Sequence, residues 1–77
     1  MAKLPRNLSG QQVRMALERA GFVLRRQRGS HMILRRDEPF ARVVVPDHSP
    51  VRVGTLKRIL NEAGLTLEDF SRLLERE

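Results

Sequence analysis

The sequence lacks cysteine, tryptophan and tyrosine, and it has only three phenylalanines in 77 residues. The missing cysteine excludes a disulfide scaffold, a thiolate metal site and a cysteine nucleophile, and nothing indicates an oxidising compartment. The longest apolar run is far shorter than the roughly 20 residues that cross a bilayer, and the N-terminal MAKLPRNLSG has no apolar signal core. We therefore expect one cytoplasmic domain over residues 1–77, with a small core and no membrane association.

Acidic residues are scarce in the first half of the chain. Residues 1–36 carry nine lysines and arginines but a single acid, Glu18, whereas residues 37–77 carry six basic and eight acidic residues. Arginine supplies 13 of the 15 cations, and its planar guanidinium can bind phosphate bidentately. A one-sided basic field of this kind is typical of nucleic-acid binding, and a basic face kept only for solubility is the less favoured alternative.

Helical and strand patterns follow one another in the order α-β-β-β-α, with a helical turn at the C-terminus. Residues 8–21 predict a helix with Ser9 as N-cap, Gln12 completing a capping box and Gly21 ending it. Strands are predicted at 22–27, 31–36 and 40–45, with turns at 28–30 and 37–39. A second helix is predicted at 54–64, and residues 66–70 open a short third one.

Short turns predict an antiparallel three-stranded meander with both helices on one face, which is a two-layer α+β fold. The double-stranded-RNA-binding domain has the same layout. In the second strand, His31, Ile33 and Arg35 share one face, and Met32, Leu34 and Arg36 share the other. The phenylalanines fit the core pattern: Phe22, Phe40 and Phe70. Without a platform for stacked bases, we expect recognition to depend on phosphate and ribose.

His31 is the strongest candidate for chemistry because it follows a Gly29-Ser30 turn, where its side chain can face solvent. Imidazole titrates near neutrality and can take a proton from a hydroxyl. RNA carries its own nucleophile, the 2′-hydroxyl beside the scissile phosphate, so one base plus cations could suffice without metal. Five arginines could supply these cations: Arg25, Arg26, Arg28, Arg35 and Arg36. On the residues alone, an ordinary turn histidine remains the favoured reading.

The neighbours of His31 and the second histidine have plainer alternatives. Gly29 can serve the turn through its freedom at positive φ, and Ser30 can donate to phosphate or simply satisfy the turn. His48, in VPDHSP, could be a general acid opposite His31, but a loop-ordering residue is the favoured interpretation, and its neighbour Asp47 could pair with it. Two histidines without a third ligand at suitable spacing argue against a zinc site, and we expect no cofactor.

Two segments are familiar in combination. RRQRGSHMIL places Gly-Ser-His just before an apolar strand, and VVVPDHSPVRVGTLKRILNEAGLTLEDF runs from a strand through a Pro-x-His loop and Gly-Thr-Leu to a final Phe. Together they resemble the active-site motif and the C-terminal signature of the HicA-type toxins, also called the YcfA-like family. The first helix also fits, so the resemblance covers nearly the whole chain. The sequence departs from the family in using arginine almost throughout and in the loop SPVRV.

The resemblance implies the toxin of a type II toxin–antitoxin system, an mRNA interferase held inactive in a hetero-oligomer by a HicB-type antitoxin. The catalytic histidine of the family maps onto His31, its motif glycine onto Gly29, and its loop histidine, structural or accessory, onto His48. We then expect a metal-independent endoribonuclease in which His31 is the general base, with Arg25, Arg26 and Arg28 as candidates for holding the phosphate. A non-catalytic RNA-binding module with the same basic face, or a partner for an acidic protein, are the alternatives.

Overall fold

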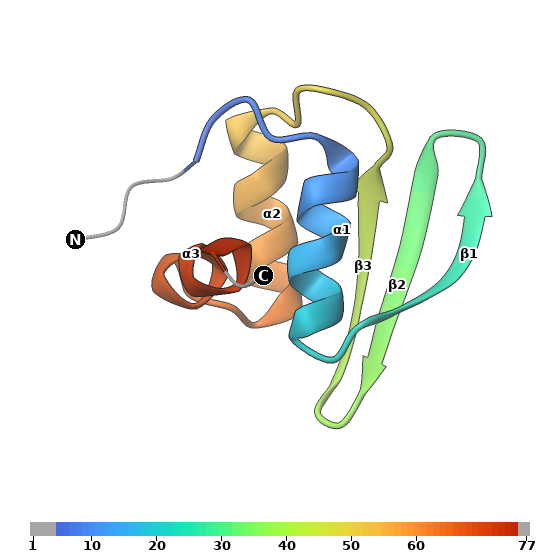
Figure 1. Cartoon of the computed structure of the whole chain (residues 1–77). Coiled ribbons are helices and arrows are strands. Elements are labelled where there is room, and N and C mark those ends of the chain that lie inside the picture. The colour runs from blue at the N-terminus through green and yellow to red at the C-terminus, as the bar shows by residue number, and fades with distance from the viewer. Residues whose placement is uncertain (1–4, 76–77) are drawn as a thin grey trace.

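The computed structural model describes residues 5–75, and it has the expected element order (Figure 1). The elements are α1 (Gly10–Arg19), β1 (Val23–Arg28), β2 (His31–Asp37), β3 (Phe40–Pro46), α2 (Val53–Ala63) and α3 (Leu67–Glu75). The strands form one antiparallel sheet in the order β1-β2-β3, so the predicted α+β fold is confirmed. No helix within the described residues is long and apolar enough to cross a membrane.

The predicted capping box begins α1. The main-chain amide of Gln12 donates to the Ser9 hydroxyl (3.1 Å), and the Ser9 amide donates to the Gln12 side-chain oxygen (2.8 Å). These two bonds satisfy donors that the first helical turn leaves without intrahelical partners. The helix ends at the predicted place, where Gly21 takes a positive φ of 96°. Local sequence signals therefore fix both ends of α1.

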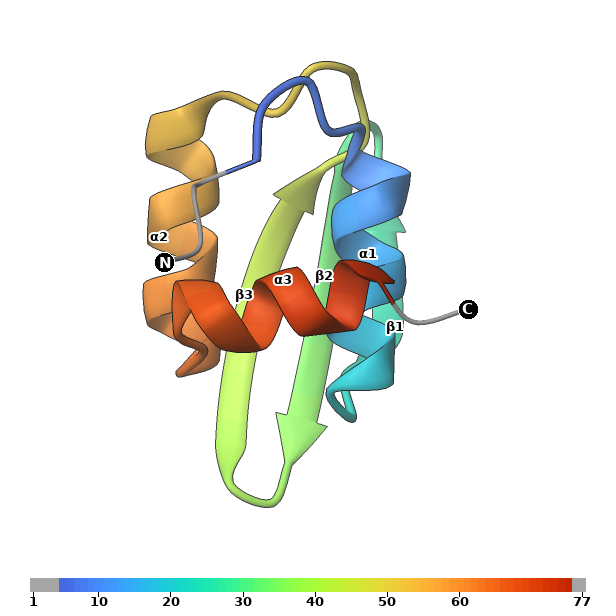
Figure 2. The same ribbon diagram turned by 60° about the vertical axis from the view of Figure 1, so that its left-hand side comes forward.

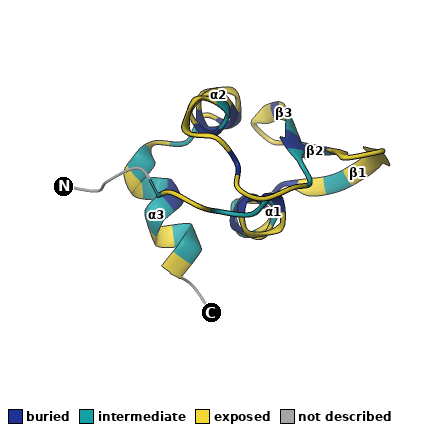
Figure 3. Cartoon of the chain, turned by 90° about the horizontal axis from the view of Figure 1, so that it is seen from above, coloured by how far each residue is buried: buried dark blue, intermediate teal, exposed yellow. Residues whose placement is uncertain are grey.

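The core lies between the sheet and the helices, on the face that carries Met32 and Leu34. These two side chains are fully buried, and the register pairs them with Val45 and Val43 of β3. Alternate residues consequently point to the opposite face, which no helix of the described chain covers. Figure 3 shows that β1 extends past the helices and is exposed along nearly its whole length. The sheet thus offers one bare face and one bare edge.

Helix α3 is longer than the expected single turn and forms a second capped helix of nine residues. It crosses the helical layer on the side away from the sheet and contacts α1 (Figure 2). Its buried residue Phe70 is fully inaccessible, and the Arg19 guanidinium donates to the Leu73 carbonyl (2.6 Å). These contacts continue the helix beyond residue 70 because they bury its apolar side.

The cap of α3 also has an electrostatic signature. The Thr66 amide donates to the Asp69 carboxylate (3.2 Å), and the Asp69 amide donates to the Thr66 hydroxyl (3.0 Å). The bond from the Thr66 main chain, followed by the bond to its side chain, lowers the pKa of the Asp69 carboxyl below its ordinary value. The bonds to the ionised Asp69 carboxylate therefore stabilise the folded state above the unfolded-state pKa. This stabilisation is lost as the pH falls through the lower pKa of the folded state.

Phe40 corrects one expectation about the core. Its side chain is 69% exposed, whereas Phe22 and Phe70 are buried as predicted. Phe40 pairs with Asp37 across the β2–β3 turn and directly precedes Ala41, which is buried. The alternation of the strand therefore turns Phe40 to the bare face, and the expectation that this ring joins the core is wrong.

Candidate nucleic-acid interface

The bare face of the sheet carries His31 and a group of arginines. The register aligns three rows of paired residues across the strands: Arg28–His31–Pro46, Arg26–Ile33–Val44 and Val23–Arg35–Arg42. Opposite residues in an antiparallel pair have neighbouring side chains on one face. His31 is exposed, with Arg28 directly beside it. We call this surface the basic face, defined by Arg26, Arg28, His31, Arg35 and Arg42.

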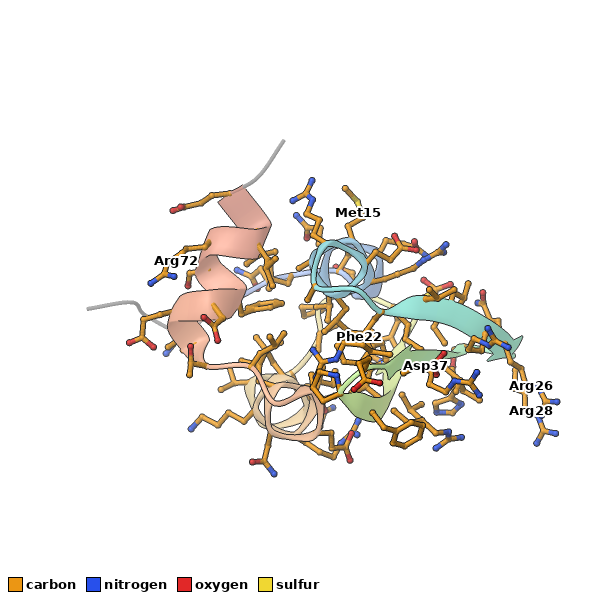
Figure 4. The ribbon with its side chains drawn as sticks, turned by 90° about the horizontal axis from the view of Figure 1, so that it is seen from below. Met15, Phe22, Arg26, Arg28, Asp37 and Arg72 are labelled. Atoms are coloured by element: carbon orange, nitrogen blue, oxygen red, sulfur yellow. The ribbon has the colours of Figure 1, made fainter. Side chains whose placement is uncertain are left out.

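A β-bulge adds one more arginine to the basic face. The register shifts between Leu24 and Arg26, so Arg25 is an extra residue in β1. A regular strand would place Arg25 and Arg26 on opposite faces, but here both line one hollow, together with Ile33 and Arg42. Figure 4 shows the side chains of Arg26 and Arg28 extending from the end of β1 into solvent. The bulge therefore concentrates positive charge beside β2.

The turn before His31 has the geometry that a glycine provides. Gly29 has a φ of 55°, in the left-handed region, and a Cβ at this position would meet nothing within 4 Å. The Gly29 carbonyl accepts from the Gln27 side chain (3.2 Å), and the Ser30 carbonyl accepts from the Asp47 amide (2.6 Å). This turn fixes the main chain at which His31 begins β2.

The last two arginines of β2 have different surroundings. Arg35 lies on the basic face and forms an ion pair with Asp37 (2.9 Å). Arg36 lies on the helix side, where its guanidinium donates to the carbonyls of Pro39 (2.9 Å) and Ala63 (3.1 Å). It also stacks over Phe22, 4.7 Å from the ring centroid. Arg36 thus ties the β2–β3 turn to the end of α2.

The loop after β3 is held by main-chain bonds to distant parts of the chain. The His48 carbonyl accepts from the Gly10 amide (2.9 Å), and the Val51 amide donates to the Leu8 carbonyl (2.7 Å). The two carboxylate oxygens of Asp47 accept from the side chains of Gln11 (3.1 Å) and Gln27 (3.0 Å). Asp47 is therefore engaged with α1 and β1, and its carboxylate bonds go to these glutamines rather than to His48.

His31 and His48 line the same pocket, which holds about 390 Å³. Its lining residues come from the start of β2, the end of β3, the loop after it and the first half of α2. These segments lie at the upper end of Figure 1. Three side chains of the α2 region complete its polar wall: Arg52, Thr55 and Arg58. Two histidines that are 17 positions apart in sequence thus face one space, next to the basic face.

Gly10 supports this loop, and its replacement makes a sharp prediction. A Cβ at Gly10 would fall on the Pro46 carbonyl oxygen and 3.0 Å from the Asp47 Cα. Glycine to alanine in a helix normally stabilises by up to about 1 kcal/mol. Here we expect Gly10→Ala to lower the free energy of unfolding by about 1–3 kcal/mol, because the loop must shift. Urea denaturation measures the change.

Gly54, the second residue of α2, is the matched control for Gly10. A Cβ there would meet nothing within 4 Å. Gly54→Ala should therefore leave the stability unchanged or raise it by up to about 1 kcal/mol. Equal effects of the two substitutions would contradict the close approach of α1 to the loop.

The structure adds residues that the sequence motifs did not identify. Arg42 belongs to the basic face because it lies opposite Arg35, and a register of the predicted hairpin could have indicated this. Arg52, Thr55 and Arg58 are far from His31 in sequence, and no local signal linked them to it. Within residues 5–75, no group of three or more His, Cys, Asp or Glu side chains is placed to hold a metal ion.

A protein-family model matches most of the chain. The family described as the HicA toxin of bacterial toxin–antitoxin matches residues 10–65 of the 77-residue chain. The matched segment includes the turn before His31, the loop with His48 and the whole of α2. A comparison with curated proteins finds no match.

Proposed function

The chain belongs to the HicA toxin family, whose members are toxins of toxin–antitoxin systems and generally RNases that cleave mRNA, and we propose that His31 is its catalytic base. One observation carries the proposal: His31 is exposed where the basic face meets the pocket at the end of β3. An imidazole in this position can reach an RNA backbone that the surrounding arginines attract.

The reaction that fits His31 is an internal transfer within RNA. His31 removes the proton of a 2′-hydroxyl, the 2′-oxygen attacks the adjacent phosphorus, and the bond to the 5′-oxygen breaks. The products are a 2′,3′-cyclic phosphate and a 5′-hydroxyl, and a proton must reach the departing oxygen. Because the substrate supplies the nucleophile, the proposed endoribonuclease needs no metal-activated water.

The RNA backbone follows the basic face in this proposal. Arginine guanidiniums bind phosphate oxygens bidentately, and the row Arg28–His31 places one of them next to the base. The exposed Gly29-Ser30 turn is close enough to His31 to contact the same backbone. Arg36 is left out of the surface, because its guanidinium is bound to carbonyls on the helix side. The remaining contacts are assigned to Arg25, Arg26, Arg35 and Arg42.

Incubation of the purified protein with a long RNA in EDTA tests the proposed function. We expect cleavage in EDTA, with fragments that carry 2′,3′-cyclic phosphate and 5′-hydroxyl ends. Fragments with 3′-hydroxyl and 5′-phosphate ends would instead make water the nucleophile and contradict the role of His31. RNA binding without any cleavage would favour the alternative, a non-catalytic RNA-binding module.

The basic face predicts the salt dependence of RNA binding. Each lost phosphate contact lowers the slope of log K against log salt by about one unit. We therefore expect Arg26→Ala/Arg28→Ala to weaken binding and to reduce the slope by about two units. Fluorescence anisotropy over a series of salt concentrations measures both quantities.

A control with the same loss of charge separates the basic face from net charge. Arg14 lies on α1, paired with Glu18, and Arg72 lies on α3, on the helix side of the sheet (Figure 4). Arg14→Ala/Arg72→Ala should reduce the slope far less than the β1 pair. Equal slopes for the two double variants would show that RNA does not bind along β1.

The family implies an antitoxin partner, and we assign it to the HicB type. An antitoxin that covers the basic face and the pocket would block RNA, because both ligands need the same arginines. Addition of the antitoxin should then release bound RNA and stop cleavage. Simultaneous binding of RNA and antitoxin would place the inhibitor elsewhere.

A further inference from the structure

We propose that the pocket shared by the two histidines holds the scissile phosphate, and that His48 is the general acid that protonates the departing 5′-oxygen. This inference rests on the proposed role of His31. His48 would supply the proton that the departing 5′-oxygen needs and that a single base does not provide. This assignment also gives a catalytic part to a loop residue whose sequence favoured a merely structural one.

The composition of the pocket fits a phosphate between two imidazoles. His31 comes from the start of β2 and His48 from the loop after β3, while Val44 and Pro46 supply apolar lining. The strand pair His31–Pro46 places the main chain of His48 only two residues beyond the partner of His31. Neither histidine therefore depends on a long flexible segment to reach the other.

The loop holds His48 in place before any substrate arrives. Its carbonyl accepts from the Gly10 amide, and the preceding residue is fixed by the bond from the Asp47 amide to the Ser30 carbonyl. Asp47 directs both carboxylate oxygens to glutamines, and His48 next to it is one of the residues that line the pocket. Catalytic groups work best when bonds of this kind already position them, because the conformational entropy of the group is then lost on folding and not during the reaction.

Positive charge on the α2 side can stabilise the phosphorane. Arg58 is held by bonds from its guanidinium to the Val44 carbonyl (3.2 Å) and the Glu62 carboxylate (2.8 Å), and it lines the pocket. Arg52 and Thr55 line the same space. None of the described lining residues is acidic, so developing negative charge on the phosphate oxygens meets cations.

The proposed step balances its protons. The 2′-hydroxyl proton goes to neutral His31 as the bond from the 2′-oxygen to phosphorus forms. The bond from phosphorus to the 5′-oxygen breaks, and protonated His48 gives its proton to that oxygen. The products are a 2′,3′-cyclic phosphate and a 5′-hydroxyl, and water returns each histidine to its starting state.

The test replaces the leaving oxygen by sulfur. A short RNA with one 5′-bridging phosphorothiolate is compared with the all-oxygen RNA, because a thiolate leaves without a proton whereas an alkoxide does not. We expect His48→Gln to cleave the oxygen substrate about 10²- to 10⁴-fold more slowly than the wild type. On the sulfur substrate the variant should come within about tenfold of the wild type, since no general acid is needed there.

His31→Gln is the matched control, because it removes the base and leaves the acid. It should stay slow relative to the wild type on both substrates. Circular dichroism and a thermal melt establish that both variants are folded. A His48→Gln variant that cleaves the oxygen substrate like the wild type, or that is equally slow on both substrates, would overturn the role of His48 and leave His31 intact. A wild type that cleaves neither substrate would overturn the proposed function as well.

Discussion

His31→Ala is expected to slow RNA cleavage by about 10²- to 10⁴-fold, the range that general-base catalysis supplies. The methyl group of alanine cannot accept the 2′-hydroxyl proton. The arginines around it are unchanged, so RNA binding is retained. Single-turnover cleavage of a labelled RNA, with protein in excess, measures the loss in the chemical step. Affinity for RNA, measured at the same salt concentration, should change by no more than a few-fold.

The exposure of His31 makes this variant a clean one. His31 lies on the bare face and is not part of the buried cluster, so its removal should change the free energy of unfolding by no more than about 0.5 kcal/mol. A variant that is folded and binds RNA but does not cleave it would identify His31 as catalytic. A variant that still cleaves at the wild-type rate would refute the assignment, whichever role the pocket has.

Phe70→Ala is expected to have the largest effect on stability. The Phe70 ring is fully buried in a hydrophobic cluster that joins the sheet, α1, α2 and α3. Removal of a buried phenylalanine ring costs about 3–5 kcal/mol. For a domain of this size, that lowers Tm by at least about 12 °C. Thermal denaturation followed by circular dichroism measures the shift.

Phe40→Ala is the matched control, since it removes the same ring from a 69% exposed position. Its stability should stay within about 0.5 kcal/mol of the wild type. If Phe70→Ala does not fold at all, Phe70→Leu provides a milder variant that should still be less stable than Phe40→Ala. Similar stability losses at both positions would contradict the separation of the bare face from the core.

Much of the fold was predictable because its signals are local. The capping box of Ser9 and Gln12, the left-handed Gly21 and the alternation along β2 each depend on residues within a few positions of one another. Short turns then required neighbouring strands to pair in sequence order. The position of His31 on the bare face of the sheet follows from the same alternation, so this part of the candidate site could be predicted as well.

The remaining features depend on contacts between distant segments. The bulge at Arg25 is set by how β1 pairs with β2, and the alternation of residues within each strand does not reveal it. The alternation of β2 already puts Arg36 on the face opposite His31, so its charge alone makes it a candidate for RNA binding. The expectation for Phe40 likewise follows its residue type, whereas the face of β3 decides where the ring lies. His31 and His48 line one pocket only because the loop after β3 folds as it does. Main-chain bonds hold this loop to α1 and to the β1–β2 turn, which are both distant from it in sequence.

The two edges of the sheet also bear on whether copies of the chain aggregate. An open strand edge has free amides and carbonyls that can template pairing with another molecule. At the β3 edge, Arg58 reaches from α2 and bonds the Val44 carbonyl. At the β1 edge, the bulge interrupts the regular ladder, and Arg25, Arg26 and Arg28 would bring like charges together if two copies paired side by side. The same arginines that attract RNA therefore oppose the growth of an extended sheet, which protects a small exposed domain from self-assembly when no polyanion is bound.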